Sequence, residues 1–233
     1  MHVFTILLLE ISSKEDYRWY RNDQWTKESF NQKIKAVKAK DWNGVGGAYG
    51  GGDTRILYET INLFKDKVVG KKALVIGSET PWVEAILLAL GAEHVTTLEY
   101  NRIISSHPQH EAILPSDLSK RFVSNGYNTL FDVVVSYSSI EHSGLTRYGD
   151  APHPWGDLVT MARNWCFTDD AGMAFIGIPT DKTDSIYFNA HRFYGSLMLS
   201  HLFTNWKLKF ASWPFEACNG RQVTFDLEKN KNL

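Results

Sequence analysis

The stretch Lys72-Ala-Leu-Val-Ile-Gly77-Ser-Glu-Thr-Pro81-Trp82-Val-Glu84 decides the fold of this 233-residue chain. A short apolar run ends in a single glycine and a polar turn, and an apolar run of helical character follows up to Leu90. A second strand-like run, Val95–Leu98, stops at the acidic Glu99. A buried strand, a tight turn, a crossover helix and an acid at the tip of the next strand form the opening unit of a nucleotide-binding α/β sheet.

The composition is that of a globular protein, with 43% hydrophobic and 22% charged residues. The 25 basic and 26 acidic residues nearly cancel, which gives no electrostatic basis for binding nucleic acid. The apolar run Met1–Leu9 lacks a basic flank and is shorter than the roughly 20 residues of a membrane helix, so we expect no membrane span. Two cysteines, Cys166 and Cys218, make no disulfide framework and leave the compartment open. Cytoplasm is the default, and the secretory pathway is the alternative if upstream residues are missing.

From residue 71 onward, strand-like and helix-like segments alternate. This alternation predicts a doubly wound, mostly parallel α/β sheet of the Rossmann-like type that ends in an antiparallel hairpin. The segment 105–120 stays ambiguous because prolines interrupt it. Beyond the first two strands, we expect strands at Phe131–Ser136 and Gly172–Ile178 (ended by Pro179), helices at Asp157–Trp165 and Tyr194–Phe203, and hairpin strands at Trp206–Ala211 and Gln222–Leu227.

The residues before this sheet predict a distinct N-terminal part. Residues 10–40 are polar and helix-prone, and six glycines follow within Gly44–Gly52. Such a stretch is either a flexible linker or a loop that covers a ligand, and Asp53 is a candidate N-cap of the helix after it. We therefore expect an N-terminal helical extension with a glycine-rich loop over residues 1–52, and an α/β domain over residues 53–233.

The turn after the first strand indicates which cofactor the sheet binds. Gly77 permits a close approach of backbone to ligand, but polar residues, including Glu79, replace the further glycines of a phosphate-binding turn. A carboxylate there disfavours a pyrophosphate and suits S-adenosylmethionine, which carries a sulfonium and an ammonium group. Glu99 follows Gly77 by 22 residues (99 − 77), close to the spacing of a ribose-binding acid. The alternative is an α/β sheet without a cofactor. The expected cofactor-binding residues are Gly77, Ser78, Glu79, Glu99, Tyr100 and Ser136.

Glu141 and His142 follow the Phe131 strand, at the sheet edge where ligands bind in open α/β folds. A histidine titrates near neutral pH and can remove the proton of a hydroxyl acceptor, while the glutamate orients it or raises its pKa. Alternatively, both residues only cap or hydrogen-bond the loop. Two later loops offer polar and aromatic groups for an acceptor, or for structural hydrogen bonds. The expected substrate-binding residues are Arg147, Asp150, His153, Trp155, His191 and Arg192.

Several classes of site lack their motif in this sequence. No paired-cysteine or His-x-x-x-His spacing indicates a metal site, so we expect no metal. A nucleophile elbow and a phosphate-cradling loop with lysine are also missing, which disfavours a hydrolase and a nucleotide kinase.

Four motifs carry a resemblance to a known family: residues 77–84, residues 91–101, Ser138-Ser-Ile-Glu-His142 and Asn189-Ala-His-Arg192. Over about residues 40 to 228 the chain resembles a Caenorhabditis-type family with a domain of unknown function and, more broadly, class I S-adenosylmethionine-dependent methyltransferases. The resemblance implies that Gly77 and its neighbours face the methionine part of the cofactor and that Glu99 faces the ribose hydroxyls. We expect methyl transfer to a hydroxyl of a small-molecule or glycan acceptor. The alternatives are a methyltransferase-like binding or scaffold protein without catalysis and, less favoured, a nicotinamide-dependent oxidoreductase.

Overall fold

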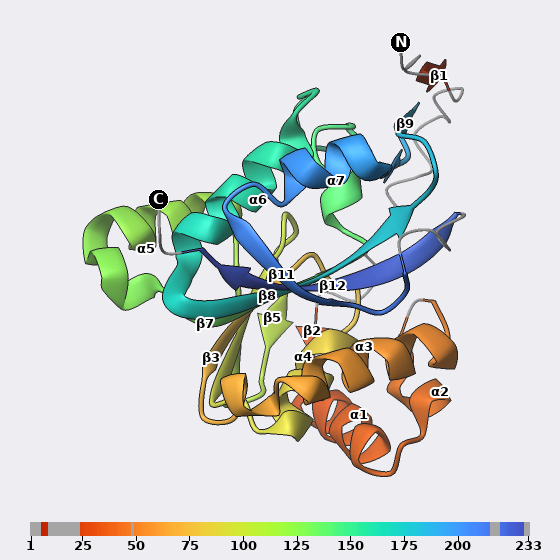
Figure 1. Ribbon diagram of the computed structural model, residues 1–233. Coiled ribbons are helices and arrows are strands. Elements are labelled where there is room, and N and C mark those ends of the chain that lie inside the picture. The colour runs from red at the N-terminus through yellow and green to blue at the C-terminus, as the bar shows by residue number, and fades with distance from the viewer. Residues whose placement is uncertain (1–5, 9–23, 48, 215–219, 231–233) are drawn as a thin grey trace.

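Strand β3 lies inside a seven-stranded sheet that crosses the middle of the molecule (Figure 1). The structure is a computed structural model and describes residues 6–8, 24–47, 49–214 and 220–230. The strand order is β11-β12-β8-β7-β3-β4-β6, in which β12 runs antiparallel to β8 and β11 and the other neighbouring strands pair in parallel. The strands are β3 (Lys72–Ile76), β4 (His94–Leu98), β6 (His110–Ile113), β7 (Phe131–Tyr137), β8 (Thr168–Thr180), β11 (Trp206–Ala211) and β12 (Arg221–Lys229).

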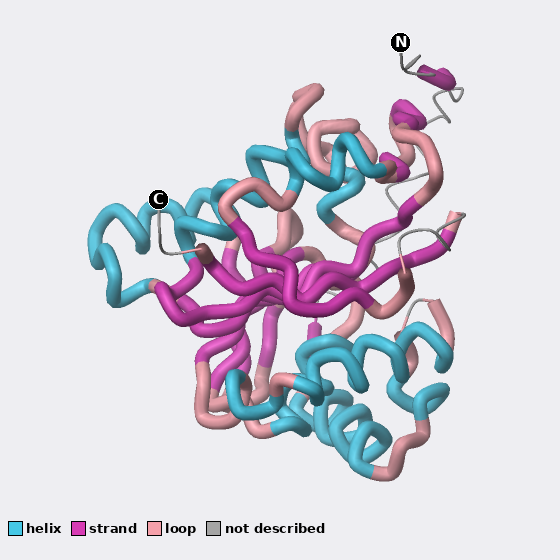
Figure 2. Tube along the Cα trace, in the orientation of Figure 1, coloured by secondary structure: helices cyan, strands magenta, loops and turns pink. Residues whose placement is uncertain are grey.

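Helices cover both faces of this sheet (Figure 2). One layer consists of α1 (Lys27–Lys38), α2 (Trp42–Val45), α3 (Gly51–Leu63) and α4 (Trp82–Leu90). The opposite layer consists of α5 (Pro115–Asn125), α6 (Gly156–Phe167) and α7 (Ser196–Leu202). Two small sheets complete the described chain: β1 (Ile6–Leu8) with β9 (Ser185–Phe188) and β10 (Arg192–Phe193), and β2 (Gln24–Trp25) with β5 (Ile104–Ser105).

The central strands are apolar on both faces because a helix layer packs on each side. Leu74 and Val134 belong to the core shared with α5, α6 and α7, while Val75 and Val135 belong to the core shared with α1 to α4. All four side chains are fully buried. Removal of this apolar surface from water is the main favourable contribution to folding, and it fixes the sheet on which the site is built.

The predicted fold class is confirmed, including the hairpin formed by β11 and β12. Helix α4 ends at Gly91, whose φ of +101° is the left-handed C-cap that the sequence predicts. The boundary expected between residues 52 and 53 lies inside α3. Val37 and Val45, which precede this boundary, belong to the same core cluster as Ile86, which follows it.

Four local predictions need correction. The ambiguous segment contains a further strand of the sheet, β6, and β8 continues through Pro179 to Thr180. Helix α7 begins at Ser196, two residues later than predicted, because Tyr194 bridges to Thr180. Asp53 is not an N-cap. Gly50 occupies that position, and the Asp53 carboxylate accepts a 2.8 Å hydrogen bond from the Tyr137 hydroxyl.

Some predictions fall partly on residues that the structure does not describe. The apolar N-terminal run contains the strand β1, and the rest of residues 1–23 lies outside the described residues. Cys218 also lies outside them, whereas Cys166 is exposed and free. In the part of the chain that is described, no helix is long and apolar enough to cross a membrane.

Asp226 places a carboxyl group in the apolar interior, in the middle of β12. It pairs in register with Phe175 of β8 and Phe210 of β11, and the residue is fully buried. Neither carboxylate oxygen has a hydrogen-bond partner among the described residues. Because burial penalises the charged form, it raises the pKa of Asp226 to about 8. The folded protein therefore holds this group as the neutral acid at neutral pH.

Asp226→Asn tests this assignment through the pH dependence of stability. Between pH of about 4 and about 8, the unfolded chain loses a proton that the folded state keeps, so wild-type stability falls as the pH rises. Relative to Asp226→Asn, we expect the wild-type free energy of unfolding to fall by up to about 1.4 kcal/mol per pH unit in that window. Urea unfolding at several pH values measures this slope, with the exposed Asp66→Asn as the control. A stability difference that does not vary with pH would contradict a neutral buried carboxyl.

Candidate functional site

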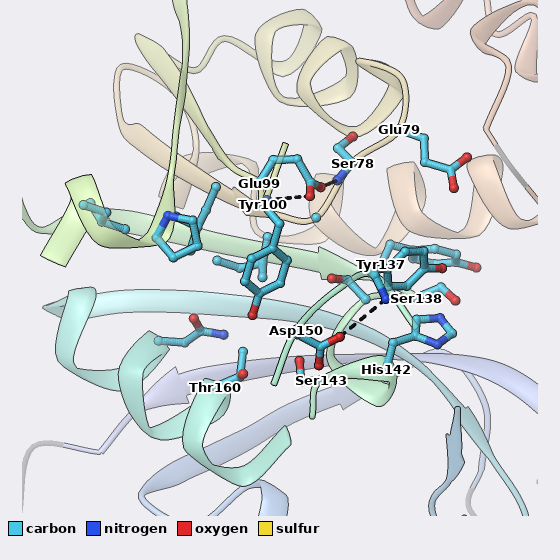
Figure 3. Close-up of a pocket in the computed structure, with 18 of the residues that line it drawn as sticks. Ser78, Glu79, Glu99, Tyr100, Tyr137, Ser138, His142, Ser143, Asp150 and Thr160 are labelled. Atoms are coloured by element: carbon cyan, nitrogen blue, oxygen red, sulfur yellow. Dashed lines mark hydrogen bonds between the residues drawn. The ribbon is translucent and has the colours of Figure 1, made fainter. Parts of the chain in front are cut away.

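A pocket of about 260 Å³ opens at the carboxyl ends of β3, β4 and β7. In Figure 3, Tyr137, Ser138 and His142 gather along one wall of the pocket, and Ser78 and Glu99 lie along another. Because parallel strands bring their carboxyl ends to one edge, residues far apart in sequence meet there. Of the predicted site residues, the pocket is lined by Gly77, Ser78, Glu79, Glu99, Tyr100, His142 and Asp150.

The turn after β3 requires a glycine at position 77. Gly77 has a φ of +70°, and its N–H donates a 3.0 Å hydrogen bond to the carbonyl of Leu98 at the end of β4. A Cβ atom on Gly77 would lie against Ser139 Oγ and 2.8 Å from Ser139 Cβ. Position 77 therefore excludes a side chain for two reasons: its backbone is left-handed, and Ser139 of the loop after β7 approaches it closely.

Glu99 joins the tips of two strands. One carboxylate oxygen accepts the backbone N–H of Ser78 at 3.1 Å, and the other accepts the N–H of Tyr100 at 2.6 Å. Burial raises the pKa of Glu99, and these backbone hydrogen bonds oppose the rise. The backbone of Asn101 also hydrogen-bonds to this carboxylate. A carboxylate has about four acceptor positions, so at least one remains for a hydroxyl of a ligand.

A buried polar network lies beneath the turn. Ser78 Oγ lies 3.2 Å from a carboxylate oxygen of Glu84, and the Thr97 hydroxyl donates to the other oxygen at 2.7 Å. His110 Nε2 lies 2.9 Å from the same Thr97 hydroxyl. Burial raises the pKa of Glu84 to about 7. Glu84 lies in an otherwise apolar helix, and no motif in the sequence predicts that it anchors the turn.

The loop after β7 forms the second polar wall. His142 Nδ1 lies 2.5 Å from the carbonyl of Ala190, and since a carbonyl only accepts, Nδ1 carries the proton. His142 Nε2 therefore keeps its lone pair. Burial lowers the pKa of His142 to about 4, so the ring is neutral at pH 7. Beside it, Glu141 is 1% exposed, and burial raises its pKa to about 7.

The predicted substrate residues separate into different environments. Asp150 lines the pocket, where its carboxylate accepts from the N–H of Gly144 at 2.5 Å. Arg147 donates to the carbonyl of Asn189 at 3.2 Å. The other predicted residues are not part of the pocket lining: Arg147, His153, Trp155, His191, Arg192, Ser136 and the predicted catalytic residue Glu141.

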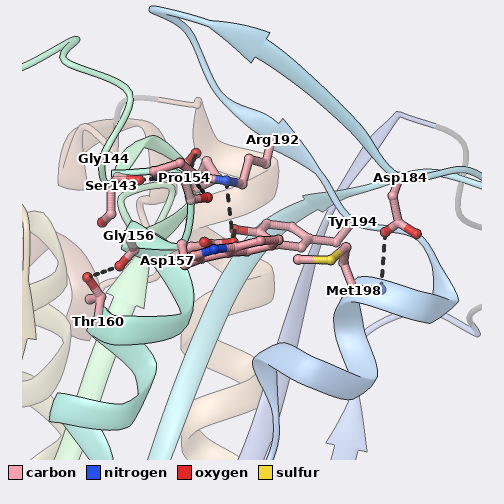
Figure 4. Close-up of polar contacts among 12 residues, drawn as sticks. Ser143, Gly144, Pro154, Gly156, Asp157, Thr160, Asp184, Arg192, Tyr194 and Met198 are labelled. Atoms are coloured by element: carbon pink, nitrogen blue, oxygen red, sulfur yellow. Dashed lines mark hydrogen bonds and ion pairs between the residues drawn. The ribbon is translucent and has the colours of Figure 1, made fainter. Parts of the chain in front are cut away.

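Arg192 has a structural position instead of a place in the pocket. Its guanidinium donates to the carbonyls of Glu141, Ser143 and Pro154 and pairs with Asp157 at 3.5 Å (Figure 4). The residue is 2% exposed. This cation ties together the loops that precede α6, which corrects the expectation that it contacts substrate.

Trp155 and Ser136 also lie outside the pocket, and Asp157 pairs with Arg192 in the interior. Asp157 is fully buried and accepts from the Tyr194 hydroxyl at 3.0 Å. Trp155 is 54% exposed. Ser136 is buried, with Oγ 3.5 Å from the carbonyl of Ile76.

The pocket also has aromatic lining residues that are not among the predicted site residues. Tyr49 comes from the glycine-rich segment, Trp82 from the start of α4, and Tyr148 from the loop before α6. The sequence indicates Tyr49 as a pocket residue only by its place, since it is the one tyrosine in the glycine-rich stretch Gly44–Gly52. In the described chain no group of three or more His, Cys, Asp or Glu side chains is placed to hold a metal ion.

Comparisons with known proteins agree with this architecture. The profile of the family described as "Caenorhabditis protein of unknown function, DUF268" matches residues 70–230. Among solved structures, a 1,6-didemethyltoxoflavin-N1-methyltransferase from Burkholderia thailandensis, with S-adenosylhomocysteine bound, is 13% identical at a TM-score of 0.52, over 88% of this chain and 90% of that one. A TehB-like SAM-dependent methyltransferase from Corynebacterium glutamicum is 17% identical at a TM-score of 0.51, over 85% of this chain and 98% of that one. At these identities the likeness establishes the fold. A search of curated proteins gave no match.

Gly77→Ala should destabilise the protein more than the matched change Gly70→Ala. Both glycines have nearly the same positive φ, +70° and +68°, but an added Cβ meets nothing within 4 Å at Gly70. We expect a loss of about 1–2 kcal/mol in Gly70→Ala from backbone strain, and a larger loss in Gly77→Ala because Ser139 must also move. Urea unfolding gives both values. Equal losses would show that the contact with Ser139 has no energetic cost.

Proposed function

The chain belongs to the Caenorhabditis DUF268 family of proteins of unknown function, and from that premise we propose that it is an S-adenosylmethionine-dependent methyltransferase. We further propose that the acceptor is a hydroxyl group of a small molecule or a glycan. The observation that carries the proposal is Glu99, a carboxylate fixed by two backbone N–H groups at the tip of β4 and exposed to the pocket beside the Gly77 turn. An acid in that place binds the ribose hydroxyls of an adenosyl cofactor.

The residues around Glu99 fit an adenosyl sulfonium compound. Glu99 would accept from the ribose hydroxyls, and the backbone at Gly77 would lie beside the methionine part. Leu98 and Leu118 give the pocket apolar surface against which the adenine ring of the cofactor would pack. Bound there, the cofactor supplies an electrophilic methyl group on a cationic sulfur. The carboxylate of Glu79, which also lines the pocket, complements that positive charge.

A phosphate-bearing cofactor fits this pocket poorly. The N–H of Ser78, which would face a pyrophosphate, already donates to Glu99. Arg163 is the one cationic side chain among the described residues of the lining, and it belongs to α6 instead of the turn. Glu79 and Glu99 place carboxylates at this turn, and carboxylates repel phosphates. This arrangement disfavours the nicotinamide-dependent alternative.

The opposite wall suits an uncharged, hydroxyl-bearing acceptor. The phenol groups of Tyr49 and Tyr148 and the carboxylate of Asp150 offer donors and acceptors beside aromatic surface. Transfer to oxygen requires removal of the hydroxyl proton, and His142 Nε2 and the Glu141 carboxylate are the nearby groups that can receive one. A net charge of −1 supports no nucleic-acid acceptor.

A second candidate is a methyltransferase-like binding protein without catalysis. The observation that favours it is the burial of His142, which is 8% exposed: burial lowers the pKa of this ring to about 4 and makes it a weak base. Cofactor binding without methyl transfer to any hydroxyl compound would support this candidate.

Isothermal titration with S-adenosylmethionine and S-adenosylhomocysteine tests the proposal, with Glu99→Gln as the informative variant. Glutamine keeps the shape, but its NH2 group cannot accept the backbone N–H that one carboxylate oxygen accepts, and it forms no charge-assisted hydrogen bonds to the ribose. We therefore expect binding about ten- to a hundredfold weaker. Glu93→Gln, an exposed position before β4, is the control and should bind like wild type. A folded wild-type protein that releases no heat with millimolar ligand would overturn the cofactor assignment. Equal affinity in Glu99→Gln would overturn the ribose assignment alone.

A further inference from the structure

Three oxygen-bearing side chains form a continuous hydrogen-bonded chain from the pocket to a buried carboxylate. The Tyr49 hydroxyl lies 2.6 Å from Ser138 Oγ, and Ser138 Oγ lies 2.6 Å from Glu141 Oε1. An ionised carboxylate only accepts, so Ser138 donates its single proton to Glu141. The Ser138 oxygen is then free to accept, and Tyr49 donates to it. All the protons in the chain thus point away from the pocket and toward Glu141.

Glu141 is an unusual end point because it is almost completely enclosed. The residue is 1% exposed, and its second oxygen, Oε2, has no hydrogen-bond partner among the described residues. Burial raises the pKa of Glu141 to about 7, against the lowering effects of the Ser138 hydrogen bond and the nearby Arg192. A carboxylate that is short of partners gains by accepting a proton. The enclosure therefore makes Glu141 a proton acceptor suited to neutral pH.

We propose that Tyr49, Ser138 and Glu141 form a proton relay that removes the hydroxyl proton of the acceptor as it is methylated. The inference rests on the proposed methyl transfer. The acceptor oxygen forms its bond to the methyl carbon while the carbon–sulfur bond breaks, and the electron pair of that bond stays on sulfur. The acceptor proton passes to the Tyr49 oxygen, the Tyr49 proton to Ser138, and the Ser138 proton to Glu141 Oε1. Glu141 ends as the neutral acid, and it returns that proton to solvent by the reverse path.

The geometry around Tyr49 holds its hydroxyl in place. Its ring packs against that of Tyr137 with centroids 5.7 Å apart, and the Tyr137 hydroxyl donates to Asp53 at the start of α3. The glycine-rich segment is thereby joined to β7 on both sides of Gly50, which has a φ of +88°. Tyr49 precedes the family match at residues 70–230, so the segment before the family domain contributes a catalytic residue.

His142 is the competing proton acceptor, and its geometry favours it less. Nε2 of His142 lies 3.9 Å from Glu141 Oε1. Burial lowers the pKa of His142 to about 4, so its ring accepts a proton less readily than Glu141 does. In the relay, His142 bounds the pocket beside Glu141 and orients the acceptor. The ionisable or charged groups that interact with Glu141 are Arg192 of β10, His142 of its own turn, Tyr137 at the end of β7, and Tyr49, Tyr148 and Tyr194.

Carboxyl ¹³C NMR of glutamate-labelled protein tests the relay without any ligand. The Glu141 signal is assigned by its loss in Glu141→Gln, and its pKa is read from a pH titration. Ser138→Ala removes the donor to the ionised form, so we expect the Glu141 pKa to rise; Tyr49→Phe should raise it by a smaller amount. Tyr58→Phe removes a phenol that packs on Trp42 away from the pocket and should leave the titration unchanged. A Glu141 pKa unaffected by both Ser138→Ala and Tyr49→Phe would overturn the relay.

Methyl transfer provides the second readout, measured as release of S-adenosylhomocysteine with a panel of simple phenols and methyl glycosides. We expect Tyr49→Phe to reduce kcat roughly a hundredfold with unchanged affinity for S-adenosylhomocysteine, and Tyr58→Phe to match wild type. Full turnover in Tyr49→Phe with no turnover in His142→Ala would overturn the relay and make His142 the base. A wild-type protein that binds the cofactor but methylates none of these hydroxyl compounds would also contradict it. Absence of cofactor binding would overturn the proposed function instead. The effect of Ser138→Ala and Tyr49→Phe on the Glu141 pKa could still be measured by NMR in that case.

Discussion

The hydrogen bond from the Ser78 N–H to the Glu99 carboxylate is the interaction on which the site depends. It links the turn after β3 to the tip of β4, and its 3.1 Å length is possible only because Gly77 bends the chain with a positive φ. The same turn leaves no room for a side chain beside Ser139, so it also sets the position of the loop after β7. The two polar walls of the pocket are therefore fixed relative to each other through one short turn. The buried Glu84 network holds that turn from below.

The sequence predicted the sheet well because its strands carry their own signal. Runs such as Val133–Val135 are β-branched, apolar and buried on both faces, and a strand of this kind is recognisable without knowledge of its neighbours. β6 lacks that signal, since its inner residues Glu111 and Ala112 are only partly buried and its first residue is a histidine. The strand is defined by pairing with β4, which no local pattern reveals.

The position of a pocket residue could be predicted only where the order of strands and turns dictates it. Glu99 lines the pocket as expected because the distance from a glycine turn to the end of the next strand is nearly constant in such sheets. Arg192 was expected to contact substrate because polar residues outside the regular strands and helices look alike in sequence whether they face a ligand or pair in the interior, as Arg192 does with Asp157. Tyr49 and Ser138 lie 89 residues apart, and their contact depends on tertiary packing that spacing in the sequence does not encode.

The strand order has a consequence for how this protein is made. β12 lies between β11 and β8, yet it is the last of the three along the chain. On the ribosome, β8 therefore emerges with an unpaired edge, and β11 cannot cover that edge because its partner is β12. The edge of β8 stays unpaired until β12, which ends at Lys229, has left the exit tunnel. Until then the nascent chain presents an open, hydrophobic strand edge, the surface that chaperones protect and that promotes aggregation when it stays uncovered.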